Sequence, residues 1–239
     1  MEVRVRREIV VWMGLSHDNI VRLLGTIKNP DYPFIGMVSD WMDNGNLADF
    51  IVEGLALPHR LQITCDVAAG LAYLHSKDVI HGDLTSGNVL IDATGRARLV
   101  DFGLSSIMAA FENTSFLTLT IGGALRFRAL EISPPLHGSP EDFHPTLTTA
   151  CDIYSLGSVT LQILSGQQPY YNIPQNDALV ALALAQQRKP DRPKSQALIG
   201  RDEYWDFILQ CWSKAQERPN AEEAHKSLIR LREEALRAQ

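Results

Sequence analysis

Two stretches of the sequence decide the fold: HGDLTSGNVL at residues 81–90 and LVDFG at residues 99–103. The apolar runs Val89–Ile91 and Ala97–Val100 flank DATG at residues 92–95. A short turn with a glycine between two apolar runs is typical of a β-hairpin. Because a hairpin brings its two ends together, we expect the residues before the first strand to lie beside those after the second.

Three oxygen-bearing side chains stand at these two ends. Asp83 and Asn88 precede the first strand, and Asp101 ends the second. Two carboxylates and a carboxamide suit Mg²⁺, which prefers hard oxygen ligands and leaves its other positions to phosphates and water. A single Asp in a loop is more often a turn or capping residue. The prediction of a magnesium and phosphate site therefore depends on the set of three.

The sequence before the hairpin predicts a short helix and a small sheet. Roughly residues 6–15 have apolar side chains on one helical face. Residues 20–27 and 35–39 are short apolar runs separated by the turn signal NPD at residues 29–31, and they read as two strands of a hairpin. The breaker DNGN at residues 43–46 is expected to form a hinge.

Beyond this hinge the pattern becomes helical. One predicted helix ends near Ser76, and its apolar face consists of Ile63, Val67, Leu71 and Leu74. Residues 153–164 are apolar nearly all round, as in a central buried helix. The last helix starts after Asn220, which can cap it while Glu223 reaches back to complete a capping box.

The spacing of the three site residues resembles a known family. HxDLxxxN, followed by DFG with the two aspartates eighteen residues apart, is similar to the catalytic and magnesium loops of protein kinases. The resemblance implies that Asp83 orients the substrate hydroxyl and accepts its proton. It also implies that Asn88 and Asp101 hold Mg²⁺ on the phosphates of ATP.

The segment SDWM at residues 39–42 resembles the kinase hinge, whose backbone binds adenine. The residues that the resemblance places at the nucleotide are Ser39, Asp40, Met42 and Leu90. Ser39 would be a small gatekeeper, and Leu90 would form the floor under the adenine. ATP and Mg²⁺ are thus the expected cofactors, and a protein substrate or partner is expected to bind beside them.

Other segments are close to patterns of the same family, namely GLAYLHSKDVIH at residues 70–81, CDIYSLG at 151–157 and CWSKAQERP at 211–219. The resemblance implies that Asp152 anchors the catalytic loop from the buried helix. It also implies that Arg218 pairs with Glu131 of ALE, a variant of the APE motif. Taken alone, Arg218 would more often be a solvated surface group.

The resemblance also assigns residues to the interior of the domain. His81 and Phe102 resemble members of the hydrophobic spine beneath the site, with Trp12 and Leu23 above them. Glu8 resembles the helix glutamate that normally pairs with a strand lysine.

The fold that the resemblance implies is α+β, with the two lobes of a protein kinase. Residues 1–42 would form a truncated N-lobe with one helix, about two strands and the hinge. Residues 43–239 would form a mainly helical C-lobe with the catalytic loop, DFG and the activation segment. The match covers nearly the whole chain and is closest in style to the tyrosine-kinase-like and Ser/Thr-kinase-like group.

The sequence also departs from the family pattern. No GxGxxG and no strand lysine precede the first helix, so we expect an N-terminally short kinase domain in which Glu8 lacks its partner. Gly82 stands where most kinases have Arg, and Thr85 and Gly87 stand where the family places a Lys or Arg near the transferred phosphate. Because the loss of one preorganised charge costs about 10²–10³-fold in rate, we expect feeble activity or none.

Three functions fit these observations. The first is a protein kinase that modifies Ser or Thr rather than Tyr. The second is a pseudokinase that acts as a nucleotide-binding or scaffold module. The third is a small-molecule phosphotransferase of the aminoglycoside or choline type, because HGDLxxGN also resembles the loop of those enzymes. Against the third stand CDIYSLG, CWSKAQERP and the stretch HDNIVRLLG at residues 17–25, which are similar to protein kinases.

The composition limits the kinds of partner and the cellular compartment that we expect for this chain. The net charge of −6 argues against a nucleic-acid partner, which would require clustered Lys and Arg. The three cysteines have no CxxC spacing, which favours a reducing cytoplasm or nucleus over a disulfide scaffold or a zinc site. The longest apolar run, residues 178–185, is too short to span a bilayer.

Overall fold

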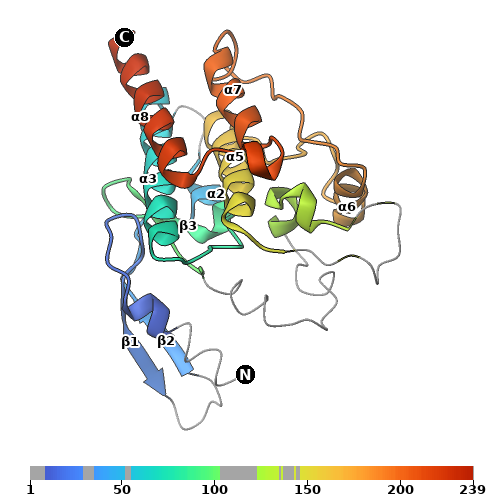
Figure 1. Cartoon of the computed structure of the whole chain (residues 1–239). Helices are drawn as coiled ribbons and strands as arrows, with labels where there is room; N and C mark the ends of the chain where they lie inside the picture. Colours follow the sequence, from blue (N-terminus) through green and yellow to red (C-terminus); the bar gives the residue numbers. More distant parts are fainter. Residues whose placement is uncertain are drawn as a thin grey trace.

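The computed structural model describes residues 9–28, 35–51, 55–102, 123–134, 136, 143 and 146–238. Within these ranges a small hairpin of β1 (Leu23–Lys28) and β2 (Ile35–Ser39) accompanies the helical residues 9–13. Figure 1 shows this hairpin projecting from a larger body that is mostly helical.

The small sheet is antiparallel, with Leu23 opposite Ser39 and Lys28 opposite Ile35. Its first strand begins at Leu23, three residues later than the predicted strand over residues 20–27. The reason is a different partner, because Val21 N–H donates to Leu99 O at 2.9 Å and Ile20 forms an isolated parallel bridge with Leu99. The residues ahead of β1 therefore join the small sheet to the larger body.

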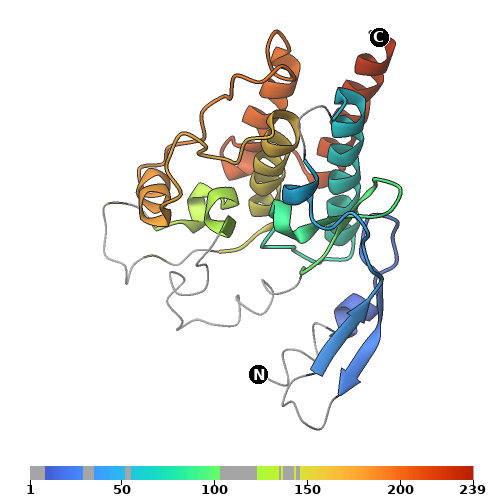
Figure 2. The ribbon, with the colours of Figure 1, turned by 180° about the vertical axis from the view of Figure 1, so that it is seen from behind.

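The larger body is built from two short strands and a set of helices. Its elements are α2 (Leu47–Phe50), α3 (Leu57–Ser76), η1 (Ser86–Asn88), β3 (Val89–Ile91), β4 (Ala97–Leu99), η3 (Gly123–Phe127), η4 (Leu130–Ile132), α5 (Thr149–Ser165), α6 (Asp177–Ala185), α7 (Asp202–Cys211), η6 (Ala215–Glu217) and α8 (Ala221–Arg237). Helix α3 packs against α8 and α5, and both opposite views show these helices running together (Figures 1 and 2).

Helix α5 lies in the centre of this body, as its all-round apolar pattern predicts, and nearly all its residues are buried. Gly157 lets α7 approach closely, because a Cβ at this position would lie 2.7 Å from the Cβ of Cys211. The indole of Trp212 donates to Tyr154 O at 3.2 Å. The end of α7 is thus fixed against α5.

The predicted second hairpin is formed by β3 and β4, with Val89 opposite Leu99. The buried Asp66 of α3 fixes its position. The Asp66 carboxylate accepts two hydrogen bonds from the Arg96 guanidinium at 2.7 and 2.6 Å and one from Ala97 N–H at 3.1 Å. Bidentate, charge-assisted bonds of this kind are strong and directional, so the hairpin that carries the site is fixed to α3.

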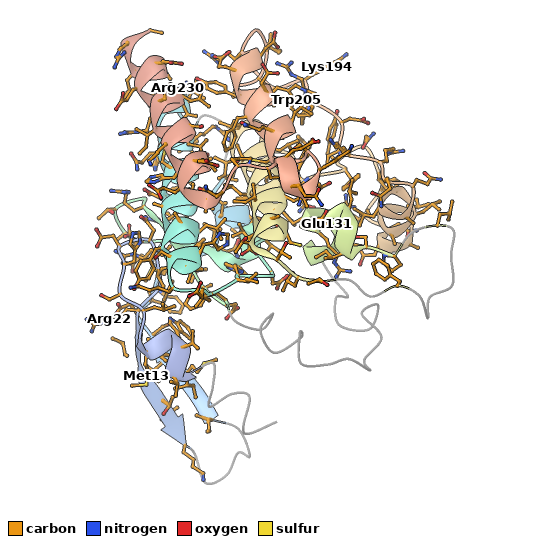
Figure 3. All side chains as sticks on the ribbon, viewed as in Figure 1. Met13, Arg22, Glu131, Lys194, Trp205 and Arg230 are labelled. Carbon is orange, nitrogen blue, oxygen red and sulfur yellow. The ribbon has the colours of Figure 1, made fainter. Side chains whose placement is uncertain are left out.

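Two further sequence predictions concern polar contacts, and the structure confirms both. Asn220 and Glu223 form a capping box at the start of α8. Arg218 donates to both carboxylate oxygens of Glu131 in η4, at 2.5 and 2.9 Å, and the side chain of Arg218 is buried. Figure 3 labels Glu131 on the light-green ribbon of η3 and η4, which lies between α5 and α6 in this view.

Two small sheets and a mainly helical remainder confirm the predicted α+β fold with a small N-terminal lobe. The division after Met42 stays a prediction, although the backbone does turn there, with Gly45 at φ +66°. In the described part of the chain, no helix combines the length and apolar character needed to cross a membrane.

We expect Glu131→Gln to lower the free energy of unfolding by about 1–3 kcal/mol, because the buried guanidinium of Arg218 loses a charged partner, whereas Glu131 itself is exposed. Burial opposes the ionisation of Glu131, but hydrogen bonds from Arg218 outweigh it and hold the pKa of Glu131 below its ordinary 4.5. This stabilisation is therefore complete above pH 4.5 and is lost as the pH falls through the lower folded-state pKa.

Urea unfolding of the wild type and the variant between pH 3 and 7 measures this difference. Glu233→Gln is the matched control, because Glu233 forms an exposed i,i+4 pair with Arg237 at 3.5 Å and such pairs contribute about 0.5 kcal/mol or less. Equal losses for the two variants at pH 7 would contradict the prediction.

Candidate active site

The loop before β3 brings Asp83 and Asn88 together. Residues 86–88 form the short η1 turn, which directs Asn88 back toward the start of the loop. The Asn88 side-chain amide donates to Asp83 O at 2.8 Å and to Asp83 Oδ2 at 3.1 Å. Because the nitrogen of this amide faces Asp83, its oxygen Oδ1 points elsewhere and can accept a ligand.

Asp101 lies at the other end of the hairpin, directly after β4. Val100 N–H donates to Asn88 O at 3.1 Å, so the two ends of the hairpin meet as the sequence predicts. Asp101 is exposed and has φ +56°, a left-handed conformation that is uncommon for a residue with a side chain. The negative charge of Asp101 contributes to the raised pKa of Asp83. The three predicted site residues therefore lie in one region.

The Asp83 carboxyl is partly buried, and burial raises its pKa above the ordinary value. The hydrogen bond from Asn88 and the positive charge of Arg128 favour the ionised form, whereas the negative charge of Asp101 opposes it. Arg128 did not emerge from the sequence, because it lies beyond the DFG segment, in LRFRALE at residues 125–131. The adjacent pair Arg126 and Arg128 is the signal that could have drawn attention to it.

The catalytic loop is anchored by Asp152 of α5, as the resemblance implies. The buried Asp152 carboxylate accepts from His81 N–H at 2.8 Å and from Gly82 N–H at 2.7 Å, and it contacts His75 Nε2 at 2.8 Å. Gly82 has φ +74°, a conformation in which a Cβ is strained. Glycine at this position therefore suits the turn that presents both N–H groups to one carboxylate.

Three aromatic rings, those of Trp12, Phe102 and His81, are joined by edge-to-face contacts next to the site. The ring of Phe102 lies edge-on to Trp12, with centroids 5.5 Å apart, and edge-on to His81 at 6.3 Å. The Trp12 indole donates to Val21 O at 2.7 Å. Burial lowers the pKa of His81, so this ring is neutral near pH 7. The contacts of Phe102 with Trp12 and His81 confirm this part of the predicted spine, and Leu23 is buried. A place for Leu23 in the spine stays a prediction.

Three of the residues predicted to bind adenine lie at or just after the end of β2, and the fourth, Leu90, lies in β3. Ser39 ends β2, Asp40 is exposed, and Met42 is buried. Leu90 of β3 bridges to Asn46 just beyond this segment, which brings the predicted floor close to the hinge. A role for these residues in nucleotide binding stays a prediction.

Some predicted features fall outside the described residues. These are Glu8, Gly103 and the rest of the segment up to residue 122. The described residues contain no group of three His, Cys, Asp or Glu side chains placed to hold a metal ion. A cation at this site would therefore depend on the Asn88 amide oxygen together with Asp101. The donor set fits Mg²⁺ for two reasons. Hard oxygen ligands are available, and a bound cation would offset the repulsion between the Asp83 and Asp101 carboxylates.

Comparison with known proteins agrees with this geometry. The sequence pattern described as protein tyrosine and serine/threonine kinase matches residues 2–228. A probable serine/threonine-protein kinase of Dictyostelium discoideum is 30% identical over 223 residues, which are 92% of this chain and 41% of that protein. Receptor-interacting serine/threonine-protein kinase 3 of Rattus norvegicus is 27% identical over 234 residues, 91% of this chain and 46% of that protein.

A serine/threonine-protein kinase-like protein of Arabidopsis thaliana is 37% identical over 166 residues, 66% of this chain and 21% of that protein. The chain therefore spans less than half of the length of each of these curated relatives.

Proposed function

The chain belongs to the protein tyrosine and serine/threonine kinase family, and on this premise we propose that its site transfers the γ-phosphate of ATP to a hydroxyl group of a protein. Serine and threonine are the proposed acceptors, because the relatives named above are serine/threonine kinases or similar to them. A small-molecule phosphotransferase is set aside, because the family match runs from residue 2 to residue 228.

In this proposal Asp83 is the residue that receives the proton of the attacking hydroxyl. The Asn88 amide holds Asp83 Oδ2 at 3.1 Å, which fixes the direction of the carboxylate. Orientation of this kind contributes to the rate of transfer, because a base acts only within hydrogen-bond reach of the proton that it accepts. The Asn88–Asp83 contact is the single observation that carries the proposal, because it sets base and metal ligand side by side.

Asn88 Oδ1 and a carboxylate oxygen of Asp101 would hold Mg²⁺. When bound, this ion neutralises charge on the phosphates of ATP. The residues themselves contribute position: the left-handed backbone at Asp101 and the η1 turn at Asn88 hold the two ligands at the two ends of one hairpin. The backbone at Asp40 and Met42, beside Ser39, would receive the adenine ring, with Leu90 beneath it.

A second candidate function is nucleotide binding without turnover, in a scaffold or pseudokinase module. The observation that favours it is the absence of any Lys or Arg from the catalytic loop, residues 81–90. Positive charge near the transferred phosphoryl group contributes strongly to phosphoryl transfer. Binding and transfer must therefore be measured separately.

We expect Asp83→Asn to reduce phosphoryl transfer to a serine/threonine peptide library by about 10²–10⁴-fold, because the amide cannot accept the hydroxyl proton. Transfer is measured with γ-labelled ATP and magnesium on the full chain. Asp78→Asn is the control, since it removes the same charge at an exposed position outside the loop. Equal transfer by the wild type and Asp83→Asn would contradict the proposed base, and nucleotide binding with no transfer by the wild type would favour the second candidate.

We expect millimolar ATP to raise the melting temperature only when magnesium is present, and Asp101→Asn to remove this magnesium-dependent rise. Asp78→Asn is the matched control, because it makes the same substitution at a residue with the same backbone angle; Asp78 and Asp101 both have φ +56°. It should keep the full rise. A thermal-shift titration with ATP plus magnesium, or ATP plus a chelator, makes the measurement. An identical rise in both variants would contradict the assignment of Asp101 as a metal ligand.

A further inference from the structure

The residues that lead into β1 connect the small lobe to the helical body. Ser16 N–H donates to the hydroxyl of Tyr73 in α3 at 2.9 Å. The ring of His17 stacks on the ring of Tyr73, with centroids 4.8 Å apart and an interplanar angle of 22°. Figures 1 and 2 both show the segment ahead of β1 beside α3. Two consecutive residues of this segment therefore contact one side chain of α3.

Asn19 continues the connection to the hairpin that carries the candidate site. The Asn19 side chain is buried, and its amide donates to Ala97 O at 2.9 Å. Asn19 O accepts from Leu99 N–H at 2.9 Å. Both partners lie in β4, the strand that precedes Asp101. Residues 16–19, which we call the clasp, thus contact α3 at one end and β4 at the other.

One hydrogen bond within the clasp depends on the ionisation of His17. Asn19 N–H donates to His17 Nδ1 at 3.0 Å. A ring nitrogen of histidine accepts a hydrogen bond only while it carries no proton, and both nitrogens of the charged ring are donors. The bond therefore requires a neutral His17 with its proton on Nε2. A proton on Nδ1 would remove the acceptor and place two N–H groups against each other.

The surroundings of His17 favour its neutral form. Burial lowers the pKa of His17 below its ordinary value of 6.5, and the negative charge of Asp18 only partly offsets this effect. The Asp18 charge is shared, because it also acts on Arg96, between β3 and β4. His17 is therefore neutral near pH 7 and takes up a proton only in more acidic solution.

Two further basic groups belong to the helices around the clasp. Burial lowers the pKa of His225 in α8, the charge of Asp66 raises it, and a charge on His17 lowers it further. Lys77 Nζ lies 5.8 Å from the centroid of the Tyr73 ring, on which His17 stacks. Like charges disfavour one another, so neither His225 nor Lys77, when charged, favours a proton on His17.

We propose that the clasp is a pH-sensitive link between the small lobe and the helical body, closed while His17 is neutral and opened when His17 takes up a proton at Nδ1. In the open state Asn19 N–H has no acceptor, and the path from α3 to β4 is weakened. Acid then loosens the residues ahead of β1, including the bond from Val21 N–H to Leu99 O. The proposal concerns the folded chain and does not rest on phosphoryl transfer.

Acid removes the contribution of the clasp over a defined pH range. Above pH 6.5, His17 is neutral in both the folded and the unfolded chain, and the contribution to stability is complete. Below pH 6.5 the unfolded chain binds the proton first, and the contribution is lost as the pH falls through the lower folded-state pKa. His17→Asn should abolish this dependence, because an asparagine side chain can accept the N–H two residues later, as in an Asx-turn, and does not titrate.

NMR titration of the full chain from pH 7.5 to pH 4.5 tests the proposal. In the wild type we expect the Nε2–H tautomer of His17 at pH 7.5, and an Asn19 amide proton that shifts with the same midpoint as the His17 ring. His17→Asn should lose this midpoint at Asn19. His225→Asn is the matched control, because it removes the other nearby imidazole and should keep the midpoint. An Asn19 resonance that ignores the His17 titration, or that keeps the midpoint in His17→Asn, would overturn the proposal.

Amide exchange at Val21 measures whether the opening reaches the small lobe. At a pH below the His17 midpoint, we expect Val21 to exchange about fivefold faster in the wild type than in His17→Asn, as for the loss of one hydrogen bond. At pH 7.5 the two should exchange equally, and amides in α5 should not differ at either pH. Equal exchange of Val21 below the midpoint would overturn the link.

The two measurements separate the clasp from the proposed function. If His17→Asn does not fold, the tautomer and the shared midpoint in the wild type decide the question alone. Neither measurement uses ATP, so a chain that shows these shifts but no phosphoryl transfer would contradict the proposed function and support the clasp. Phosphoryl transfer by a chain whose Asn19 amide ignores the His17 titration would overturn the clasp and leave the proposed function supported.

Discussion

The rest of the site depends on one buried carboxylate, that of Asp152 in α5. It is 1% exposed and accepts the N–H groups of His81 and Gly82, while His75 of α3 contacts it at 2.8 Å. A buried charge is tolerated only when such hydrogen bonds compensate the loss of water. The loop is constrained in turn, because it can donate two hydrogen bonds to the Asp152 carboxylate only in the conformation that presents two successive N–H groups. The central helix therefore determines the shape of the loop that carries Asp83.

A second buried carboxylate, Asp66, does the same for the hairpin. Through Arg96 and the N–H of Ala97 it fixes the hairpin to α3. The loop and the hairpin are thus anchored to two helices that pack against each other. With both anchored, Asn88 and Asp101 lie at the two ends of one hairpin, where Val100 N–H donates to Asn88 O. The arrangement thus follows from the helical body as well as from contacts among the site residues.

Much of this could be predicted from the sequence, because it is encoded in short stretches. The hairpin, the buried α5 and the capping box at Asn220 follow from local pattern, and the Asp152 and Arg218 contacts follow from family resemblance. The start of β1 could not be predicted, since Val21 pairs with Leu99, far along the chain, instead of continuing the strand. Arg128 was missed for the same reason. Its effect on Asp83 arises from tertiary structure, and nothing in the loop itself indicates it.

Amide hydrogen exchange at His81 and Gly82, compared between the wild type and Asp152→Asn, tests this account most directly. Asparagine offers one acceptor oxygen where the carboxylate offers two, so a loop N–H group loses its partner. The account predicts that exchange at these two amides accelerates by at least about tenfold, the equivalent of about 1.4 kcal/mol, while amides in α8 keep their protection. Unchanged protection at His81 and Gly82 would contradict the claim that Asp152 determines the shape of the catalytic loop.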